Sequence, residues 1–449
     1  MLTCGNQLGR ALFDKLAVEE SADMSRESAF FRSPGDVGND RSVVSAFNKR
    51  RARAVLVDME PKVIQQCYKP SKSREVRAAG MWEYEPKGAF TRQSGSGNNW
   101  ASGYRAQGTQ VESELLDLLQ SPIDPVLWWF CCKEAERCDL LKGFLTLQSA
   151  AGGTGSGLGS FLTERLADFY PSTSLVNAVV WPYQSGEVIV QNYNAMLTMA
   201  SLSDVAHGIL MLQNDAASLI CQKLLRIPHP SFEAMNEVLA THLASSFLTV
   251  DADAECQLSR TLDPLGEICE RLCQHSAFKL LDIKMAPLMP RQSKKFSSHT
   301  WAGIVKRLHQ MQVANAAFEE GVDWDISLDT TQGRALNRSV GSMLILRGNN
   351  SKQADPTPFL DPRMYASWNT DPFRCYSSSS NFNSYDKTGT VISNSKAMLQ
   401  TLAITMDKAY EMFSHGAYLH QYERFGIDRD FFQEAFLRVD QITQNYSSL

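Results

Sequence analysis

The chain has 449 residues, of which 43% are hydrophobic and 21% are charged. This length exceeds one ordinary core and predicts two or three packed subdomains of a soluble globular protein. The net charge of −5 and the lack of a long basic stripe argue against a nucleic-acid partner. The longest strongly apolar run, residues 126–132, is too short to cross a bilayer, so we expect no membrane association.

The cysteines and histidines predict neither a disulfide framework nor an imidazole metal site. The ten cysteines are scattered without paired CxxC spacing, which favours reduced thiols in a cytoplasmic protein. The eight histidines contain no HExxH motif. The first residues carry no charged-then-apolar signal-peptide pattern.

Apolar strands alternate with helical segments through residues 1–213, which we interpret as the first domain. Strands are predicted at residues 53–58, 143–147, 178–181 and 209–212. Apolar residues recur at helical spacing from Leu158 to Phe169, and the breaker Pro171 follows. This alternation predicts an α/β fold with a Rossmann-type parallel sheet, helices on both faces, and ligands at the carboxyl ends of the strands.

The rest of the chain divides into three further regions. A long helix from Ser231 to Phe247 occupies the centre of residues 214–250, which we interpret as a core helix and linker. Residues 251–402 mix helices with strands, such as residues 342–346, and predict a second, intermediate α/β domain. Two helices at residues 402–422 and 430–446, separated by a turn at Gly426, form a C-terminal region at residues 403–449.

A glycine-rich loop connects the strand at residues 143–147 to the next helix. Residues 149–157 read SAAGGTGSG, and the glycines leave out Cβ atoms that would keep backbone N–H groups away from an anion. The helix N-terminus adds partial positive charge at the same point. Candidate phosphate contacts are Ser149, Gly152, Gly153, Thr154, Gly155 and Ser156. No Lys follows the glycines, so the loop is not a Walker P-loop, and its alternative role is a turn that packs strand on helix.

Two further glycine segments favour a nucleoside triphosphate as the anion. Flexible backbone donors and an amide, suited to the distal phosphate, come from Gly95, Ser96, Gly97 and Asn98. A third segment, at the start of a predicted helix, places Cys4 and Gln7 around a glycine and an asparagine.

Two carboxylates predict a cation beside these loops. Asp58 and Glu60 lie at the end of a predicted strand, where they are placed to hold a hydrated Mg²⁺ against the phosphates. Either carboxylate alone is also typical of a helix cap. Combined with the three glycine segments, they predict one triphosphate pocket.

These segments resemble those of the tubulin family. GGTGSG at residues 152–157 is the family signature, and CGNQLG at residues 4–9 is similar to its CGNQIG. GSGNNWA at residues 95–101 and DMEP at residues 58–61 resemble GAGNNWA and DLEP. ISNS at residues 392–395 and AYLHQY at residues 417–422 resemble IGNS and AFLHWY. The resemblance extends from Cys4 to Tyr446 and implies a tubulin-like fold that binds GTP with Mg²⁺.

Two stretches are most similar to the delta-tubulin subfamily. They are ARAVLVDMEPKVI at residues 52–64 and WPYQSGEVIVQNYN at residues 181–194. This resemblance implies a cytoskeletal protein of centrioles and basal bodies in the cytoplasm, where the subfamily supports triplet microtubules and cilium assembly. It also implies other tubulin-family subunits, microtubules and centriole components as partners.

The resemblance also implies contacts to the nucleoside. Asn214 and Asn236 match the asparagines that read the guanine base. Phe232 matches the aromatic residue that stacks on the base, where the family usually has Tyr, and its alternative role is a core residue of the long helix. Glu187 and Gln191 match the acidic residues that meet the ribose, with Gln191 in place of an acid.

Tubulin-like active sites are completed when subunits stack head to tail. Within DPLGEI at residues 263–268, Glu267 matches the acid that one subunit supplies to the nucleotide of the next. A carboxylate there orients or deprotonates the attacking water, a contribution of about 10²–10⁴-fold. Pro264 replaces a residue that the family usually keeps polar, and the alternative role of Glu267 is a solvated residue on a helix face.

Three features depart from the family pattern. The family begins with an apolar strand before its CGNQ loop, and we interpret the short segment before Cys4, with Thr3 in place of a family Gln, as a truncated gene model or an alternative start. Residues 120–132 insert two prolines and two adjacent tryptophans into an expected helix, which favours a misannotated splice boundary over a membrane anchor or a partner-binding loop. The acidic tail of bulk tubulins is missing, so proteins that dock on such tails should bind little.

The sequence therefore predicts a GTP-binding structural protein with assembly-dependent hydrolysis. The basic segment at residues 291–296 stands where tubulins make lateral contacts with a neighbouring protofilament. One alternative is a GTP-binding scaffold that regulates microtubule or centriole assembly without hydrolysis. Another is a monomeric enzyme on a dinucleotide fold, although the sequence places no general-base His or reactive Cys to support it.

Overall fold

The computed structural model covers residues 1–449. It describes residues 3–21, 28–32, 49–69, 82–85, 88–92, 95–108, 135, 138, 140–186, 188–250, 264–294, 296–326, 328 and 336–449. The segment at residues 120–132 lies outside the described residues, as do Glu187 and Asp263.

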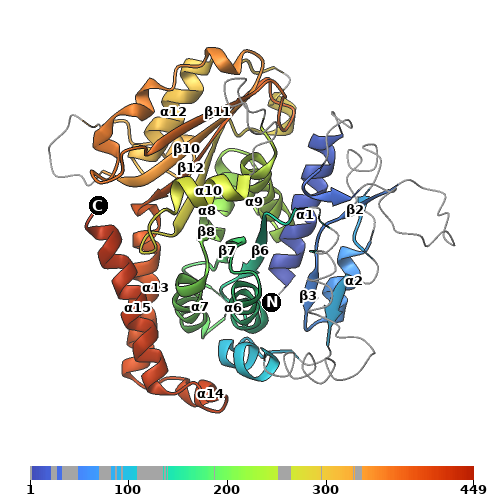
Figure 1. The fold of residues 1–449 in the computed structure, drawn as a ribbon, viewed down its shortest axis with the longest axis vertical. Coiled ribbons are helices and arrows are strands. Elements are labelled where there is room, and N and C mark those ends of the chain that lie inside the picture. Colours follow the sequence, from blue (N-terminus) through green and yellow to red (C-terminus); the bar gives the residue numbers. More distant parts are fainter. Residues whose placement is uncertain are drawn as a thin grey trace.

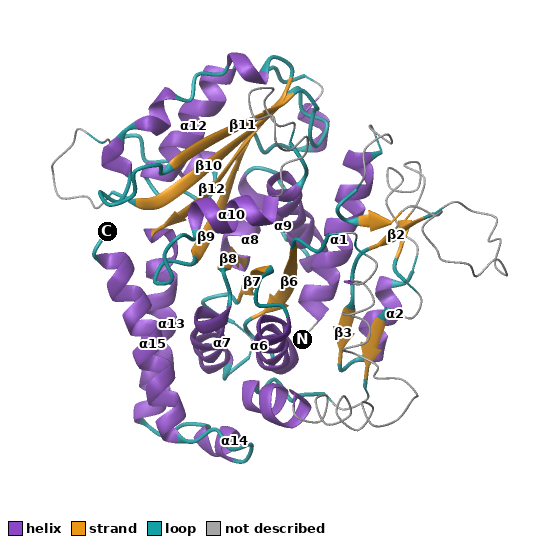
Figure 2. Ribbon diagram, viewed as in Figure 1, coloured by secondary structure: helices purple, strands orange, loops and turns teal. Residues whose placement is uncertain are grey.

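One seven-stranded sheet runs through the molecule in the order β11-β10-β12-β9-β8-β7-β6. Its strands are β6 (Gly143–Ser149), β7 (Ser174–Trp181), β8 (Gly208–Gln213), β9 (Leu280–Ala286), β10 (Ser339–Gly348), β11 (Phe373–Ser378) and β12 (Lys387–Ser395). From β6 to β9 the strands are parallel, β12 is antiparallel to both of its neighbours, and β10 and β11 are parallel. Figure 2 shows these strands passing from the centre to the upper part of the molecule. The β8–β9 pairing thus joins the first half of the chain to the second in one sheet.

Helices cover both faces of this sheet (Figure 1). In β7, Ala178 and Val180 pack in one apolar cluster with α1 (Thr3–Glu20) and α9 (Phe232–Phe247). Val179 and Trp181 pack in another cluster with α7 (Gln191–Val205). Successive side chains of a strand point to opposite faces, so a strand that is buried along nearly its whole length, such as β7, needs helices on both. This arrangement confirms the predicted α/β fold.

The remaining helices extend these two layers. With α1 and α9 lie α8 (Asn214–Lys223) and α10 (Pro264–Leu272). With α7 lie α13 (Leu399–Ser414), α14 (Leu419–Glu423) and α15 (Arg429–Ser447). The long helix α12 (Trp301–Val313) packs on β9, β10 and β12 through its own cluster. The other elements are α2 (Pro61–Cys67), α6 (Gly159–Phe169), α11 (Arg291–Lys294), two π-helical turns, η2 (Ser102–Gln107) and η3 (Thr154–Leu158), and 3₁₀ turns at Glu319–Gly321, Ser351–Gln353, Thr357–Leu360, Pro362–Met364 and Lys396–Met398.

Five short strands lie beside this sheet without joining it. They are β1 (Phe31–Arg32), β2 (Arg50–Ala52), β3 (Leu56–Asp58), β4 (Trp82–Glu83) and β5 (Ala89–Thr91). β3 pairs only with β5, and β6 ends the seven-stranded sheet, so no strand in the described part of the chain connects β3 to β6. Helix α1 contacts both strands instead. Side chains from the middle of β6 are consequently half-buried, whereas nearly all those of β7 are buried.

Local backbone geometry changes several predicted boundaries. The strand predicted at residues 53–58 pairs only from Leu56, because the N–H of Arg53 donates to the carbonyl of Phe30 at 2.8 Å instead. The helix predicted from Leu158 begins a turn earlier, with η3 at Thr154. The helix predicted at residues 402–422 breaks after α13, where Gly416 and Tyr418 adopt positive φ angles of 65° and 60°.

Candidate nucleotide-binding site

The two principal glycine loops lie against each other at the carboxyl end of β6. Gly152, Gly153, Thr154, Gly155 and Ser156 are all buried. A Cβ atom on Gly153 would come within 2.7 Å of the backbone nitrogen of Asn99, so only glycine permits this approach. The hydroxyls of Ser96 and Thr154 share a buried hydrogen bond of 2.8 Å between the loops. The structure therefore brings these two predicted segments together.

The second loop turns sharply where it faces the first. Gly97 and Asn98 adopt positive φ angles of 55° and 54°, and both are exposed, as is Gly95. A Cβ on Gly95 would meet nothing within 4 Å. The backbone of Gly97 and Asn98 is therefore accessible to a ligand.

A buried asparagine that the sequence interpretation missed joins both loops. The amide nitrogen of Asn194, on α7, donates to the carbonyls of Asn98 and Ala151, each at 2.8 Å. Its Oδ1 accepts from the N–H of Trp100 at 2.9 Å and from the hydroxyl of Tyr422 at 2.7 Å. Asn194 is completely buried and uses both ends of its amide. It therefore fixes the spacing of the loops and ties them to the C-terminal helices.

The start of α1 forms a third side of the site. A Cβ on Gly5 would lie 2.3 Å from the carbonyl oxygen of Leu147, so α1 begins directly against the end of β6. The side chain of Asn6 donates to the carbonyl of Val57 at 2.9 Å and to Oδ2 of Asp58 at 3.2 Å. Asn6 was not among the predicted contacts, yet it links α1 to β3. All three glycine segments thus converge on one end of β6.

Cys4 and Gln7 lie on the first two turns of α1, and both are half-buried. Burial raises the pKa of the Cys4 thiol to about 12. The thiol is therefore protonated at neutral pH, which suits packing beside a ligand and does not suit a nucleophile.

Hydroxyls predicted as phosphate donors are bound within the protein. Oγ of Ser149 accepts from the N–H of Ala151 at 3.3 Å, and Oγ of Ser156 donates to the carbonyl of Gly152. These bonds shape the loop itself. The N–H groups at the start of η3 remain the natural phosphate donors, because the first turn of a helix lacks carbonyl partners for them.

The two predicted metal ligands differ in their surroundings. Asp58 is completely buried, and its Oδ1 accepts from the N–H of Glu60 at 3.1 Å while Oδ2 accepts from Asn6. Burial raises the pKa of the Asp58 carboxyl. The Glu60 side chain is exposed and makes no capping bond to α2. Within the described residues, no group of three His, Cys, Asp or Glu forms a metal cluster. A hydrated Mg²⁺ can therefore meet the exposed Glu60 directly, whereas Asp58 would first have to release its bond to Asn6.

The loop between β7 and α7 connects to the helices that carry the predicted base contacts. The N–H of Gln184 donates to Asp215, next to Asn214, at 3.1 Å. Likewise the hydroxyl of Tyr183 contacts the sulfur of Met235, next to Asn236, at 2.8 Å. Asn214 is half-buried at the start of α8, and Asn236 is buried on α9. This loop thus contacts both of the helices that carry the two asparagines.

The remaining residues predicted to contact the nucleoside have distinct environments. Gln191 is buried at the start of α7, where its amide donates to the carbonyl of Tyr183 at 2.8 Å. Phe232 is 49% exposed at the first residue of α9, which excludes its alternative role as a core residue. Its exposed ring is available for stacking on a planar ligand.

The candidate acid Glu267 lies in the first turn of α10. Pro264 begins this helix, a position where the fixed φ of proline is favourable and its missing N–H costs nothing, so it does not distort the helix start. The Glu267 side chain is 22% exposed and accepts from the hydroxyl of Tyr376, in β11, at 2.7 Å. It is therefore neither a freely solvated residue nor a buried one.

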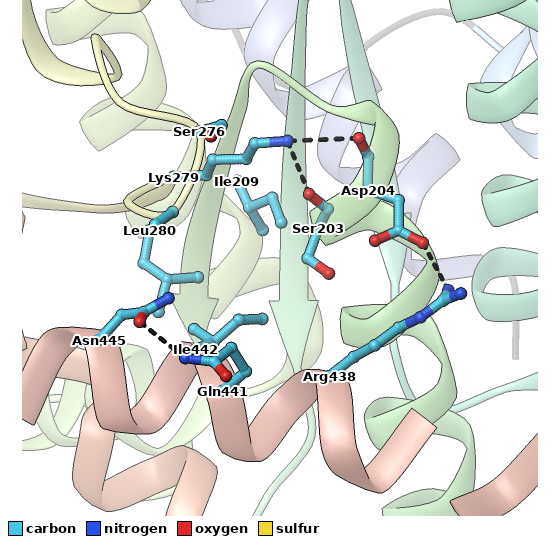
Figure 3. A pocket seen from close by; sticks show the side chains of 11 residues that line it. Ser203, Asp204, Ile209, Ser276, Lys279, Leu280, Arg438, Gln441, Ile442 and Asn445 are labelled. Atoms are coloured by element: carbon cyan, nitrogen blue, oxygen red, sulfur yellow. Dashed lines mark hydrogen bonds and ion pairs between the residues drawn. The ribbon is translucent and has the colours of Figure 1, made fainter. Parts of the chain in front are cut away.

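A cavity of about 220 Å³ lies away from these loops, between α15 and the first residues of β8 and β9 (Figure 3). Its cations already have partners: Lys279 donates to the backbone carbonyl of Ser203 at 2.6 Å, and Arg438 pairs with Asp204 at 2.5 Å. The figure shows both contacts on the rim of the cavity. This cavity contains none of the predicted nucleotide contacts. Separately, no helix in the described part of the chain is long and apolar enough to span a membrane.

Comparisons with known proteins agree with this geometry. Residues 3–222 match the model of the Tubulin/FtsZ family GTPase domain. The tubulin delta chain of Canis lupus familiaris is 38% identical over 467 residues, covering 99% of this chain and 98% of that protein. The delta chains of Macaca fascicularis and Mus musculus are each 37% identical, covering 99% of this chain and 98% and 97% of those proteins. The chain therefore belongs to the tubulin family, as a GTP-binding protein that resembles the delta chains.

Proposed function

We propose that this protein is a GTP-binding structural subunit of centrioles and basal bodies that supports triplet microtubules and cilium assembly. The observation that carries the proposal is the joining of two glycine loops through Ser96, Thr154 and Asn194 at the carboxyl end of β6. A preformed cradle of backbone donors at that edge suits a triphosphate. Similarity to tubulin delta chains supports the cytoskeletal setting and its partners, which are other tubulins and microtubules.

Different residues are proposed to contact the phosphates, the base and the ribose of the nucleotide. Phosphates lie on the helix N-terminus at Thr154, on the turn at Gly97 and on the start of α1. Mg²⁺ is held through water by Asp58 and Glu60. The base meets Asn214 and Asn236 and stacks on Phe232, and the ribose meets Gln191 and Glu187, the latter outside the described residues.

Hydrolysis is proposed to require two stacked subunits, because Glu267 of one subunit contacts the nucleotide that the next subunit binds. The carboxylate takes a proton from the attacking water as the water oxygen bonds to the γ-phosphorus and the bond to the bridging oxygen breaks. Replacing Glu267 with Ala should slow single-turnover GTP hydrolysis in assemblies with tubulin by about 10²–10⁴-fold, because the base is lost. GTP binding to the isolated variant should remain normal. Unchanged turnover in those assemblies would remove Glu267 from the mechanism.

A second candidate is a scaffold that binds GTP without hydrolysing it. This candidate differs from the first only in whether GTP is hydrolysed, and the bond from Tyr376 to Glu267 is compatible with both. The same single-turnover assay separates the two functions. A scaffold would hold GTP intact in assemblies that contain the wild-type chain.

The proposed location is tested in ciliated cells. A fluorescently tagged full-length chain should concentrate at centrioles and basal bodies, and depletion should reduce the number of triplet microtubules seen in cross-section. Diffuse signal with unchanged triplets would contradict the centriolar role while leaving GTP binding intact.

A further inference from the structure

Glu267 is held by a side chain that lies 109 residues away in the sequence. Tyr376 donates its phenol hydrogen to Oε2 of Glu267 at 2.7 Å, and Nε of Arg271, one turn along α10, lies 3.5 Å from the same oxygen. The other oxygen, Oε1, has no hydrogen-bond partner among the residues that the structure describes. One oxygen of the carboxylate is therefore fixed and the other is left open.

A second layer of charges holds this arrangement. Arg271 also contacts Asp371 at 3.2 Å, and Arg374 contacts the same carboxylate oxygen at 2.6 Å. Burial, and then the bond to Glu267, raise the pKa of the Tyr376 hydroxyl well above its usual value. The phenol thus stays protonated and acts only as a donor to Glu267. This network joins α10 to β11 and to the residues immediately before that strand.

We propose that Tyr376 is a positioning residue for GTP hydrolysis, which presents Oε1 of Glu267 to the water that attacks the neighbouring subunit's nucleotide. This inference rests on the proposed role of Glu267 as the base. A base needs a third group to fix its orientation, and a hydrogen bond to the far oxygen does so without blocking the near one. The proton passes from water to Oε1, and Tyr376 keeps its own proton throughout.

Two other roles for Tyr376 predict different rates of hydrolysis when its hydroxyl is removed. If the bond from Tyr376 withheld Glu267 from the nucleotide, removing the phenol would speed hydrolysis. If Tyr376 only stabilised the packing of α10 on β11, removing the phenol would lower stability and leave kcat unchanged. Kinetics of one conservative variant therefore distinguish the three roles.

The test uses the full-length Tyr376→Phe variant in assemblies with tubulin, after subtraction of phosphate released by tubulin alone. We expect kcat to fall about tenfold, the effect of one lost hydrogen bond, with KM for GTP unchanged. The matched control is Tyr385→Phe, which removes a phenol that accepts from the N–H of Met289 at 3.0 Å. This control should keep the wild-type kcat. An unchanged or raised kcat in Tyr376→Phe overturns the proposal.

A double-mutant cycle separates this proposal from the one on which it rests. In a Glu267→Gln background, Tyr376→Phe should cause no further loss, because it acts through the carboxylate. If Glu267→Gln slows turnover and the two effects multiply independently, Tyr376 is not acting through Glu267 and only this inference fails. If Glu267→Gln has no effect, or the wild-type chain adds no turnover, the proposed hydrolysis and this inference fail together.

Discussion

Asn194 holds the two glycine loops of the nucleotide site together. Its one amide satisfies two carbonyls, one N–H and one hydroxyl, which come from the two glycine loops and from α14. A buried polar group that loses its partner costs about 1–3 kcal/mol. The geometry of the phosphate loops therefore depends on a residue that need not touch the phosphates.

Replacing Asn194 with Ala should lower the free energy of unfolding by about 3 kcal/mol or more, because several buried groups lose partners at once. Affinity for GTP should fall as well, since the loops lose their spacing. Asn369→Ala is the matched control: its amide donates to the carbonyl of Val340 at 2.8 Å, in the second half of the chain. We expect the control to lose some stability and keep its GTP affinity, as measured by urea unfolding and nucleotide titration. Equal GTP affinity in wild type and Asn194→Ala would contradict this role.

A pair of glycines tests how closely the two loops must approach. A Cβ on Gly157 would lie 2.1 Å from the carbonyl oxygen of Trp100, whereas a Cβ on Gly95 would meet nothing within 4 Å. Gly157→Ala should therefore force the loops apart, with a lower melting temperature and weak GTP binding. Gly95→Ala should melt as the wild type does. Similar melting of the two variants would show that the loops are not in contact as described.

At the scale of elements, α11 is fastened to the first half of the chain. Asn383, in the loop before β12, accepts from Lys15 of α1 at 2.8 Å through Oδ1 and from Lys294 of α11 at 2.8 Å through its carbonyl. Its N–H donates to Glu19 at 3.1 Å. Through this loop residue, α11 is held against α1.

This contact predicts a dependence of stability on pH. Burial, and then the nearby charges of Lys15 and Arg291, lower the pKa of Lys294 from 10.5 to about 8. The carboxylates of Glu19 and Glu237 act in the opposite direction, and their effect is smaller. Between these two pKa values the unfolded chain binds a proton that the folded chain does not. Stability contributed by Lys294 should therefore rise with pH from about 8 toward 10.5.

The measurement is the difference in unfolding free energy between the wild type and Lys294→Met across that pH range. We expect this difference to shift in favour of the wild type as the pH rises. Lys62→Met, on the exposed side of α2, is the control and should give a flat difference. A flat difference for Lys294→Met as well would mean that α11 is not docked in solution.

Periodicity and glycine placement predicted several of the elements, because these signals are local. The strands β6, β7, β8 and β10 and the helix α9 follow from apolar runs and from Ser231, whose side chain caps α9 by accepting from Ala234. Asn194 gave no signal, because an asparagine within an apolar helix looks like any tolerated polar residue. The partnership of Tyr376 with Glu267 was equally hidden, since nothing local links residues so far apart.

At the scale of the whole molecule, one sheet connects the two α/β regions that the sequence predicts. The boundary placed at residue 251 falls between β8 and β9, yet these strands pair through Ile209 and Leu210 with Leu280 and Leu281. Pairing between distant strands depends on how the helices pack and leaves no local pattern. The nucleotide edge at β6 and the acid on α10 therefore belong to one connected framework, which suits a subunit that binds GTP at one place and presents Glu267 at another.

The identity of the nucleotide carried by the purified full-length chain tests the central claim most directly. The protein is denatured, and the released nucleotide is separated by chromatography and identified by mass. We predict a guanine nucleotide, stoichiometric with the chain in the wild type and lost from Gly157→Ala. Recovery of NAD or FAD, or of no guanine nucleotide from folded wild-type protein, would contradict the account.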